Sequence, residues 1–109
     1  MSLTNEERQI IVNLELEKAQ KTFNTMELCV REKAFESAAN RIYYAAFHAI
    51  SALLIDAGFA VKSHRGVIMR DNADYNCFYE ATEEKLTPYI EPTRQLIEKI
   101  KQYIAEKDK

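Results

Sequence analysis

The chain of 109 residues is long enough for one domain but too short for a second hydrophobic core. Its two Gly and two Pro exclude most sandwiches and barrels, whose many short strands need many turns, and its composition favours helices. A formal net charge of -2 excludes a global attraction for nucleic acid and leaves only a local basic patch as a route to it.

The first helix is predicted to begin after Thr4 and to run to about Val30. Thr4 and Glu7 have the spacing of a capping box, in which the hydroxyl accepts from the Glu7 amide and the carboxylate returns to the cap. Apolar residues at steps of three and four predict one buried face, with charged residues such as Glu15 and Lys18 on the other. The residues assigned to the buried face are Ile10, Ile11, Leu14, Ala19, Phe23, Met26 and Val30.

A short connector over residues 31–34 leads to a second predicted helix, from about Phe35 to Ala57. Gly58 follows it as a C-terminal cap that can take a positive φ without strain. Two apolar stripes run along this helix, so it should be central, with neighbours on two sides or a partner chain on one. One stripe is Ile42, Ala46, Ala49 and Leu53, and the other is Tyr43, Phe47, Ile50 and Leu54.

The last predicted helix ends the chain, and its start is ambiguous. Thr82 and Thr87 are both suitable caps, and Pro92 indicates a late start or a kink. Its apolar residues at helical spacing are Leu96, Ile97, Ile100, Tyr103 and Ile104. In residues 59–81 the apolar residues follow no sustained helical or strand spacing. The pattern predicts an all-α fold: one domain over residues 1–109, built as an up-and-down bundle of antiparallel helices around a central apolar helix.

The sequence contains no recognisable targeting segment. The first residues lack a basic region before an apolar run, and the longest apolar tract, 45–55, is too short for a membrane span. A cytoplasmic location is expected by elimination. Cys29 and Cys77 form no CxxC pair and are expected to be reduced. Neither a metal nor another cofactor is expected, because His48 and His64 stand on separate segments.

The run NRIYYAAFHAISALLIDAGFAVKSHRGV, residues 40–67, carries an R-x-Y-Y-A-x-F-H pattern. This run resembles the HEPN family (higher eukaryotes and prokaryotes nucleotide-binding domains), and in particular its small stand-alone prokaryotic members. The matching residues are Arg41, Tyr43, Tyr44, Ala45, Phe47 and His48, then Lys62, Ser63, His64 and Gly66. A later stretch, residues 69–84, is similar through Arg70, Asp74, Tyr75, Phe78 and Tyr79.

The resemblance implies a helical bundle that is commonly a homodimer, and many relatives act as toxins beside a minimal nucleotidyltransferase antitoxin. It also implies a missing segment. Relatives carry about 25 to 35 further residues between the equivalents of Gly66 and Arg70, longer than an ordinary connection. Either a helix has been lost, or a helical segment between Val67 and Ile68 is absent from the sequence. Absence is favoured, because losing the helix would expose apolar surface of the second helix.

In active HEPN ribonucleases, an Arg is followed about four to six residues later by a His, and the pair supplies a cation for the phosphate and a base for the 2′-hydroxyl. Arg70 stands at the usual position here, but Asp74, Tyr75, Asn76 and Cys77 follow it and none is a histidine. A phenol, whose ordinary pKa is about 10, is a poor base at neutral pH. Arg70 is therefore expected to hold a phosphate, but the histidine base that should accompany it is absent.

A second match lies inside the second predicted helix, where Arg41 precedes His48 by two turns. Both should project from one face with Cα atoms about 10 Å apart, a gap that a phosphate can bridge. The alternative, which the residue types favour, is that Arg41 pairs with an acidic neighbour while His48 makes a hydrogen bond within an aromatic core.

Two further groups have a binding and a structural interpretation. Lys62, His64 and Arg65 form a basic cluster that would dock a phosphate or an acidic partner, although a solvated loop is favoured. Four tyrosines have rings that can stack on a base, although core or dimer packing is favoured; they are Tyr43, Tyr44, Tyr75 and Tyr79.

The leading interpretation is a homodimeric HEPN module that binds RNA or a nucleotide, or docks a nucleotidyltransferase-type antitoxin. Its candidate binding residues are Arg41, Tyr44, His64, Arg65, Arg70, Asp74 and Tyr75. One rival is a metal-independent endoribonuclease toxin that uses Arg70, Arg41 and His48 in catalysis; the residues favour binding over catalysis. The other rival is a structural dimer without ligand chemistry.

Overall fold

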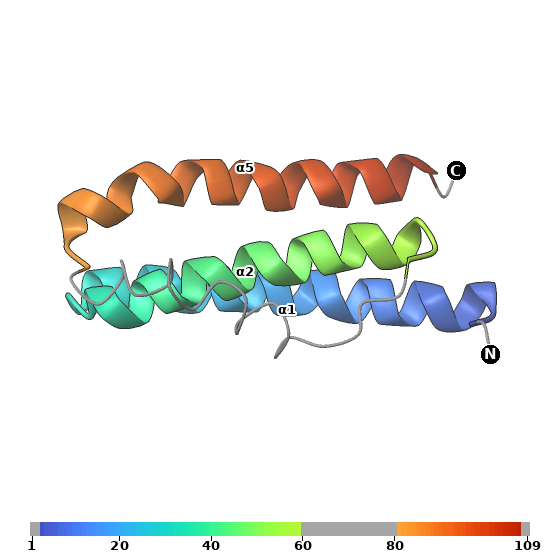
Figure 1. The fold of residues 1–109 in the computed structure, drawn as a ribbon, viewed down its shortest axis with the longest axis horizontal. Coiled ribbons are helices and arrows are strands. Elements are labelled where there is room, and N and C mark those ends of the chain that lie inside the picture. Colours follow the sequence, from blue (N-terminus) through green and yellow to red (C-terminus); the bar gives the residue numbers. More distant parts are fainter. Residues whose placement is uncertain (1–2, 60–80, 108–109) are drawn as a thin grey trace.

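The computed structural model describes residues 3–59 and 81–107, and these contain three helices and no strand. The helices are α1 (Asn5–Arg31), α2 (Phe35–Asp56) and α5 (Glu83–Lys107). α1 and α2 form an antiparallel hairpin, and α5 lies along α2 and runs in the same direction as α2 (Figure 1). The predicted all-α helical bundle is confirmed.

The predicted capping box starts α1. The Thr4 hydroxyl accepts a hydrogen bond from the Glu7 amide at 3.1 Å, and the Glu7 carboxylate accepts one from the Thr4 amide at 2.9 Å. These bonds satisfy two amides that the first turn of a helix leaves without intrahelical partners. Hydrogen bonding by Thr4, first by its amide and then by its side chain, lowers the pKa of the Glu7 carboxyl from its ordinary value of 4.5.

α1 and α2 end in the same local motif. At the end of α2, the Phe59 amide donates to Leu54 O at 2.9 Å and the Gly58 amide donates to Ile55 O at 3.0 Å. This is a Schellman motif, which requires a left-handed residue after the cap. Gly58 supplies it with φ 97°, as the sequence predicts.

The same motif at the end of α1 uses a lysine. The Ala34 amide donates to Cys29 O at 2.7 Å and the Lys33 amide donates to Val30 O at 3.0 Å. Lys33 has φ 63°, a region in which an L-residue with a Cβ is strained. The turn between the helices is therefore tight, and it directs α2 back along α1.

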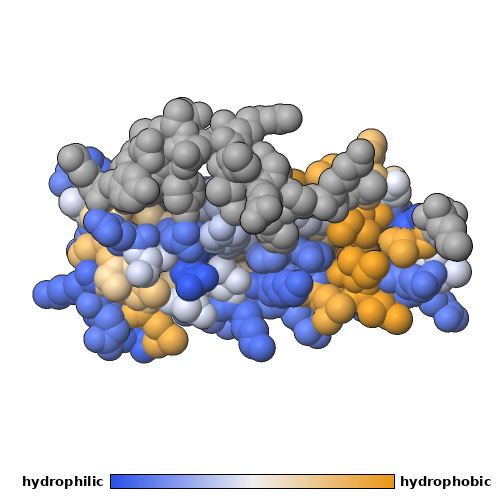
Figure 2. Space-filling view, turned by 60° about the horizontal axis from the view of Figure 1, so that its bottom comes forward, coloured by the Kyte–Doolittle hydropathy of each residue, from blue (hydrophilic) through white to orange (hydrophobic). Residues whose placement is uncertain are grey.

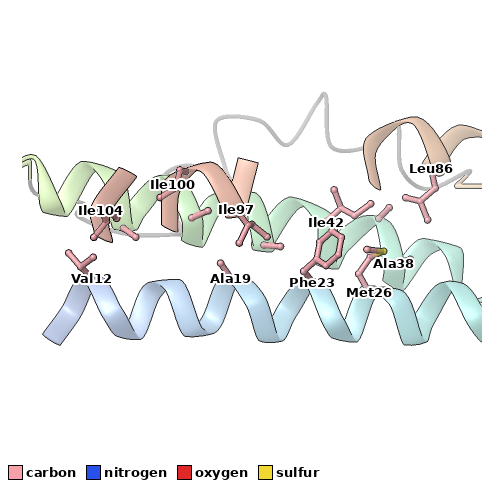
Figure 3. Packing of buried hydrophobic residues seen from close by; sticks show 14 residues of the cluster. Val12, Ala19, Phe23, Met26, Ala38, Ile42, Leu86, Ile97, Ile100 and Ile104 are labelled. Carbon is pink, nitrogen blue, oxygen red and sulfur yellow. The ribbon is translucent and has the colours of Figure 1, made fainter. Parts of the chain in front are cut away.

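α2 is the central helix, as predicted, because it packs against both α1 and α5 while these two touch each other much less. Figure 3 shows Phe23 and Met26 pointing from α1 toward Ile42 and Ala38 of α2. Most of the α2 contribution is alanine, which lets the neighbouring helices approach closely. The buried apolar residues are Val12, Ala19, Phe23, Met26, Ala38, Ala39, Ile42, Ala45, Ala49, Ala52, Leu86, Ile97, Ile100 and Ile104.

Three assignments on α1 are wrong. Ile10 and Leu14 were predicted to be buried, but they are 59% and 49% exposed, and Val12 is buried instead. Glu15 was predicted to face solvent, but its side chain is only 14% exposed. α1 carries apolar residues on several faces, so spacing alone does not choose among them. The packing of α2 and α5 chooses the face that contains Val12.

α5 begins at the earlier of the two predicted caps. The Thr82 hydroxyl accepts from the Lys85 amide at 3.2 Å, whereas the Thr87 hydroxyl donates to Glu83 O at 2.7 Å within the helix. Pro88 and Pro92 both lie inside α5 and cannot donate to the preceding turn. The first turns of α5 bend relative to the rest (orange in Figure 1), as the missing bonds lead one to expect.

Candidate functional site

The main polar contact between α1 and α2 joins His48 to Glu15. His48 Nδ1 lies 2.7 Å from Glu15 Oε2, and the two side chains are 13% and 14% exposed. A carboxylate only accepts, so Nδ1 carries the proton and donates it. The short distance is typical of a charge-assisted hydrogen bond, which is stronger than a neutral one. The pair therefore links the two helices and fixes one edge of the imidazole.

Aromatic rings surround the same part of α2. The Phe47 ring meets the His48 ring edge-on, with centroids 5.9 Å apart and an interplanar angle of 83°. Tyr43 stacks on Phe47 at 6.5 Å and meets Tyr44 edge-on at 5.3 Å. The structure thus shows His48 with a hydrogen bond in an aromatic setting.

Two exposed cations lie on the helices that carry this pair. Arg41 stands two turns before His48 on α2 and is exposed, and no carboxylate of the described residues lies within ion-pair distance of it. Lys18 Nζ lies 3.8 Å from Glu15 Oε1, with its side chain 57% exposed. Because α1 and α2 are antiparallel, Lys18, which lies one turn after Glu15 on α1, is level with the part of α2 between Arg41 and His48. We call Lys18, Arg41 and His48 the basic face.

The structure describes only one of the other predicted binding residues. Tyr44 is half-buried on α2 beside Tyr43. The remaining candidates lie outside the described residues, so their roles stay predictions: His64, Arg65, Arg70, Asp74 and Tyr75. Lys62 and Cys77 lie there too, whereas Cys29 is a half-buried free thiol.

Glu15 is the site residue that the sequence interpretation missed. Its one signal is a row at steps of four, Ile11, Glu15 and Ala19, in which an acid stands between two apolar residues. An acid in such a row is expected to have a partner on the neighbouring helix when the row is buried. The identity of that partner depends on the register of the two helices, which the sequence does not reveal.

Within residues 3–59 and 81–107, no three His, Cys, Asp or Glu side chains are grouped so that they could hold a metal ion. Among the three helices that the structure describes, none has both the length and the apolar character that crossing a membrane requires.

Comparison with known proteins identifies relatives. A UPF0332 protein of Thermotoga maritima is 32% identical over 69 residues, which are 63% of this chain and 52% of that protein. A protein of Methanocaldococcus jannaschii named "Putative toxin" is 24% identical over 119 aligned positions, with 85% of this chain and 81% of that protein covered. The match thus spans about half the length of the Thermotoga relative. No solved structure matches this chain significantly.

The alignment to the Methanocaldococcus protein has more positions than this chain has residues, so that protein carries residues without a counterpart here. A segment missing between Val67 and Ile68 would have this effect. These two residues lie outside the described ranges, and the missing segment stays a prediction.

The family model of the HEPN domain matches residues 12–103, from the second turn of α1 to the end region of α5. The matched range contains Glu15, Lys18, Arg41 and His48. Since the match covers most of the chain, this protein belongs to the HEPN domain family.

Proposed function

We propose that this chain is a homodimeric HEPN module that binds RNA, or a nucleotide, through phosphate contacts on the basic face. The observation that supports the proposal is the His48–Glu15 pair, with Lys18 3.8 Å from the Glu15 carboxylate and Arg41 exposed two turns before His48 on α2. Phosphate contacts supply most of the affinity in sequence-independent nucleic-acid binding. With a net charge of -2, the chain has to bind RNA through such a local group.

The proposed dimer accounts for apolar surface that the described helices leave exposed. Ile10 and Leu14 of α1 are about half exposed, and Ile50 and Leu54 of α2 are 44% and 39% exposed. These residues lie toward the end of the bundle where α1 begins and α2 ends, where Figure 2 shows orange hydrophobic surface. Exposed apolar patches of this kind commonly mark interaction surfaces. Sedimentation as a monomer at micromolar concentration would contradict the dimer.

The proposed partner is a minimal nucleotidyltransferase antitoxin. Membership of the HEPN family and the toxin name of the Methanocaldococcus relative support this part of the proposal. Co-expression with the product of an adjacent nucleotidyltransferase gene, followed by co-purification through a tag on one chain, tests it. The pairing is rejected if the two proteins separate at physiological salt.

RNA binding is tested with fluorescence anisotropy of a labelled single-stranded RNA over a series of salt concentrations. Arg41→Ala and Lys18→Ala should each weaken binding and reduce the slope of log affinity against log salt by about one. Lys99→Ala is the matched control, because it removes the same charge from an exposed position on α5. An equal loss in the control would show that net charge, and not the basic face, governs binding.

A metal-independent ribonuclease is the second candidate. The specific observation in its favour is the carboxylate-bound histidine two turns from an exposed arginine, which are the residue types that such a reaction uses as base and as phosphate ligand. Wild-type protein, His48→Ala and Arg70→Ala are incubated with RNA in EDTA. Absence of cleavage by the wild type, or equal cleavage by all three, removes this candidate. A wild type that dimerises but neither binds nor cleaves RNA would instead support a structural dimer.

A further inference from the structure

We infer that one side of α5, formed by Tyr89, Leu96 and Tyr103, is the surface on which a second copy of this chain docks. The α5 helices of the two copies pack antiparallel, and the two-fold axis of the dimer passes at Leu96. The homodimer itself belongs to the proposed function, on which this surface rests. The surface, the direction of packing and the register go beyond it, and a dimer formed through another surface would leave the proposed function standing.

The three residues follow one another at steps of seven along α5. Seven residues are almost two turns of an α-helix, so their side chains project from nearly the same side, with neighbours about 10 Å apart. Tyr89 and Tyr103 are each 55% exposed, and Leu96 is half-buried at the edge of the core. A single exposed apolar residue needs no explanation, whereas a row at this spacing is typical of a helix that packs against another helix.

This row lies on the flank of α5 that borders α2. Lys107, one turn after Tyr103, donates from Nζ to Asp56 Oδ2 of α2 at 3.3 Å. Lys101 lies on the other flank and reaches α1 instead. Because α2 and α5 run in the same direction (Figure 1), Ile50, six residues before Asp56, lies level with the residue six positions before Lys107. Ile50 is 44% exposed, so apolar surface is present on α2 at the level of Tyr103 as well.

The row is symmetric about its middle residue. In an antiparallel pair of α5 helices centred on Leu96, the two leucines meet at the axis, and Tyr89 of each copy is level with Tyr103 of the other. A two-fold dimer requires a surface that is complementary to itself in this way. Tyrosine is also enriched in the centre of protein interfaces, because its ring buries a large apolar area while its hydroxyl finds a polar partner.

The charges at the two ends of α5 agree with antiparallel packing. In this register, Lys85 of one copy is level with the turn that holds Glu106 and Lys107 of the other. Lys107 is paired with Asp56 of its own chain, so Glu106 supplies the opposite charge that faces Lys85. In a parallel pair, each of these charges would face its own copy, and like charges repel each other. Charge therefore favours the antiparallel direction.

Disulfide cross-linking tests the axis. Leu96→Cys is made in a chain whose native cysteines, Cys29 and Cys77, are replaced by serine, and oxidised glutathione is the oxidant. Residues at a two-fold axis meet their own copies, so Leu96→Cys should run as a linked dimer on a denaturing gel. Glu98→Cys, at an exposed position on another side of α5, is the matched control and should run as a monomer. No link in a Leu96→Cys protein that sediments as a dimer would overturn the axis.

The direction of packing is tested in the same cysteine-free background. Neither Tyr89→Cys nor Tyr103→Cys should link to itself, whereas an equimolar mixture, with a tag on one chain, should give the mixed dimer. Parallel packing predicts the reverse, so self-linking of either variant without the mixed product would overturn the antiparallel register. The mixture decides the surface even if Leu96→Cys does not fold.

Sedimentation of the chain with its native cysteines gives an independent readout. Tyr103→Glu places a charge in the apolar row and should weaken the dimer about tenfold or more, because buried aromatic residues commonly dominate interface affinity. Gln102→Glu adds the same charge at the preceding exposed position, 100° around the helix, and should leave dimerisation nearly unchanged. Equal effects of the two variants on a dimeric wild type would overturn the docking surface and leave the homodimer in place. A monomeric wild type would remove the proposed homodimer, and this surface with it.

Discussion

Lys33→Gly should stabilise the protein, because Lys33 is a non-glycine residue at φ 63° in the motif that ends α1. A left-handed conformation costs an L-residue about 1–2 kcal/mol. Glycine removes that cost but loses about 0.5–1 kcal/mol through the greater freedom of the unfolded chain. The Lys33 side chain is exposed and has no ion pair or hydrogen bond to the described residues, so its loss removes little else. The net gain should be about 0.5–1 kcal/mol.

The change in the free energy of unfolding is measured by urea unfolding, with far-ultraviolet circular dichroism as the signal. All samples have the same protein concentration, because association alters apparent stability. The melting temperature should rise by about 2–6 °C. Lys33→Ala is the matched control: it also removes the long side chain but keeps the Cβ, so it should leave stability nearly unchanged. If Lys33→Ala stabilises as much as Lys33→Gly, the gain does not come from backbone strain.

Gly58→Ala is the reciprocal test at the end of α2. Gly58 has φ 97°, and a Cβ added there would meet no atom within 4 Å. Steric contact therefore adds nothing, and the expected loss of about 1 kcal/mol is due to the backbone conformation alone. A neutral Gly58→Ala together with a neutral Lys33→Gly would refute the explanation of both helix ends.

Three further predictions concern the core and the caps. Phe23→Ala, at a site 2% exposed, should cost about 3–5 kcal/mol in urea unfolding, whereas Leu28→Ala, 53% exposed on the same helix, should cost less than about 0.5 kcal/mol. Similar costs for the two would contradict the assigned core face of α1. Thr82→Ala should lower stability by about 1 kcal/mol through loss of the α5 cap, and no change in the urea midpoint would place the start of α5 elsewhere. The pKa of Glu7 is lowered from its ordinary value of 4.5, so the charged carboxylate stabilises the folded state at any pH above 4.5. This contribution is lost as the pH falls through the lowered pKa. The wild type should therefore exceed Glu7→Gln in urea midpoint at neutral pH and equal it in strong acid; a gap that persists in acid would contradict this assignment.

Features that depend on neighbouring residues in the chain were predictable from the sequence. The capping box of Thr4 and Glu7 and the left-handed Gly58 each involve a few consecutive residues, so the residue types alone indicate them. The central position of α2 was also predictable, because a helix with two apolar stripes needs more than one neighbour. The start of α5 was only narrowed to two caps, since Thr82 and Thr87 both suit a helix start.

Features that depend on how the helices pack were not predictable. Spacing shows that α1 has apolar faces, but only contact with α2 and α5 decides that Val12 is buried while Ile10 and Leu14 are exposed. The candidate site depends even more strongly on how the helices pack. His48 could be identified in the sequence, whereas its partner Glu15, 33 positions away, was assigned to solvent. The sequence by itself determined the three described helices, the start of α1, the end of α2 and the family pattern around Arg41 and His48. The tertiary structure decided which charged residue the histidine meets, because that depends on the register and rotation of two helices, and local residue preferences do not specify either.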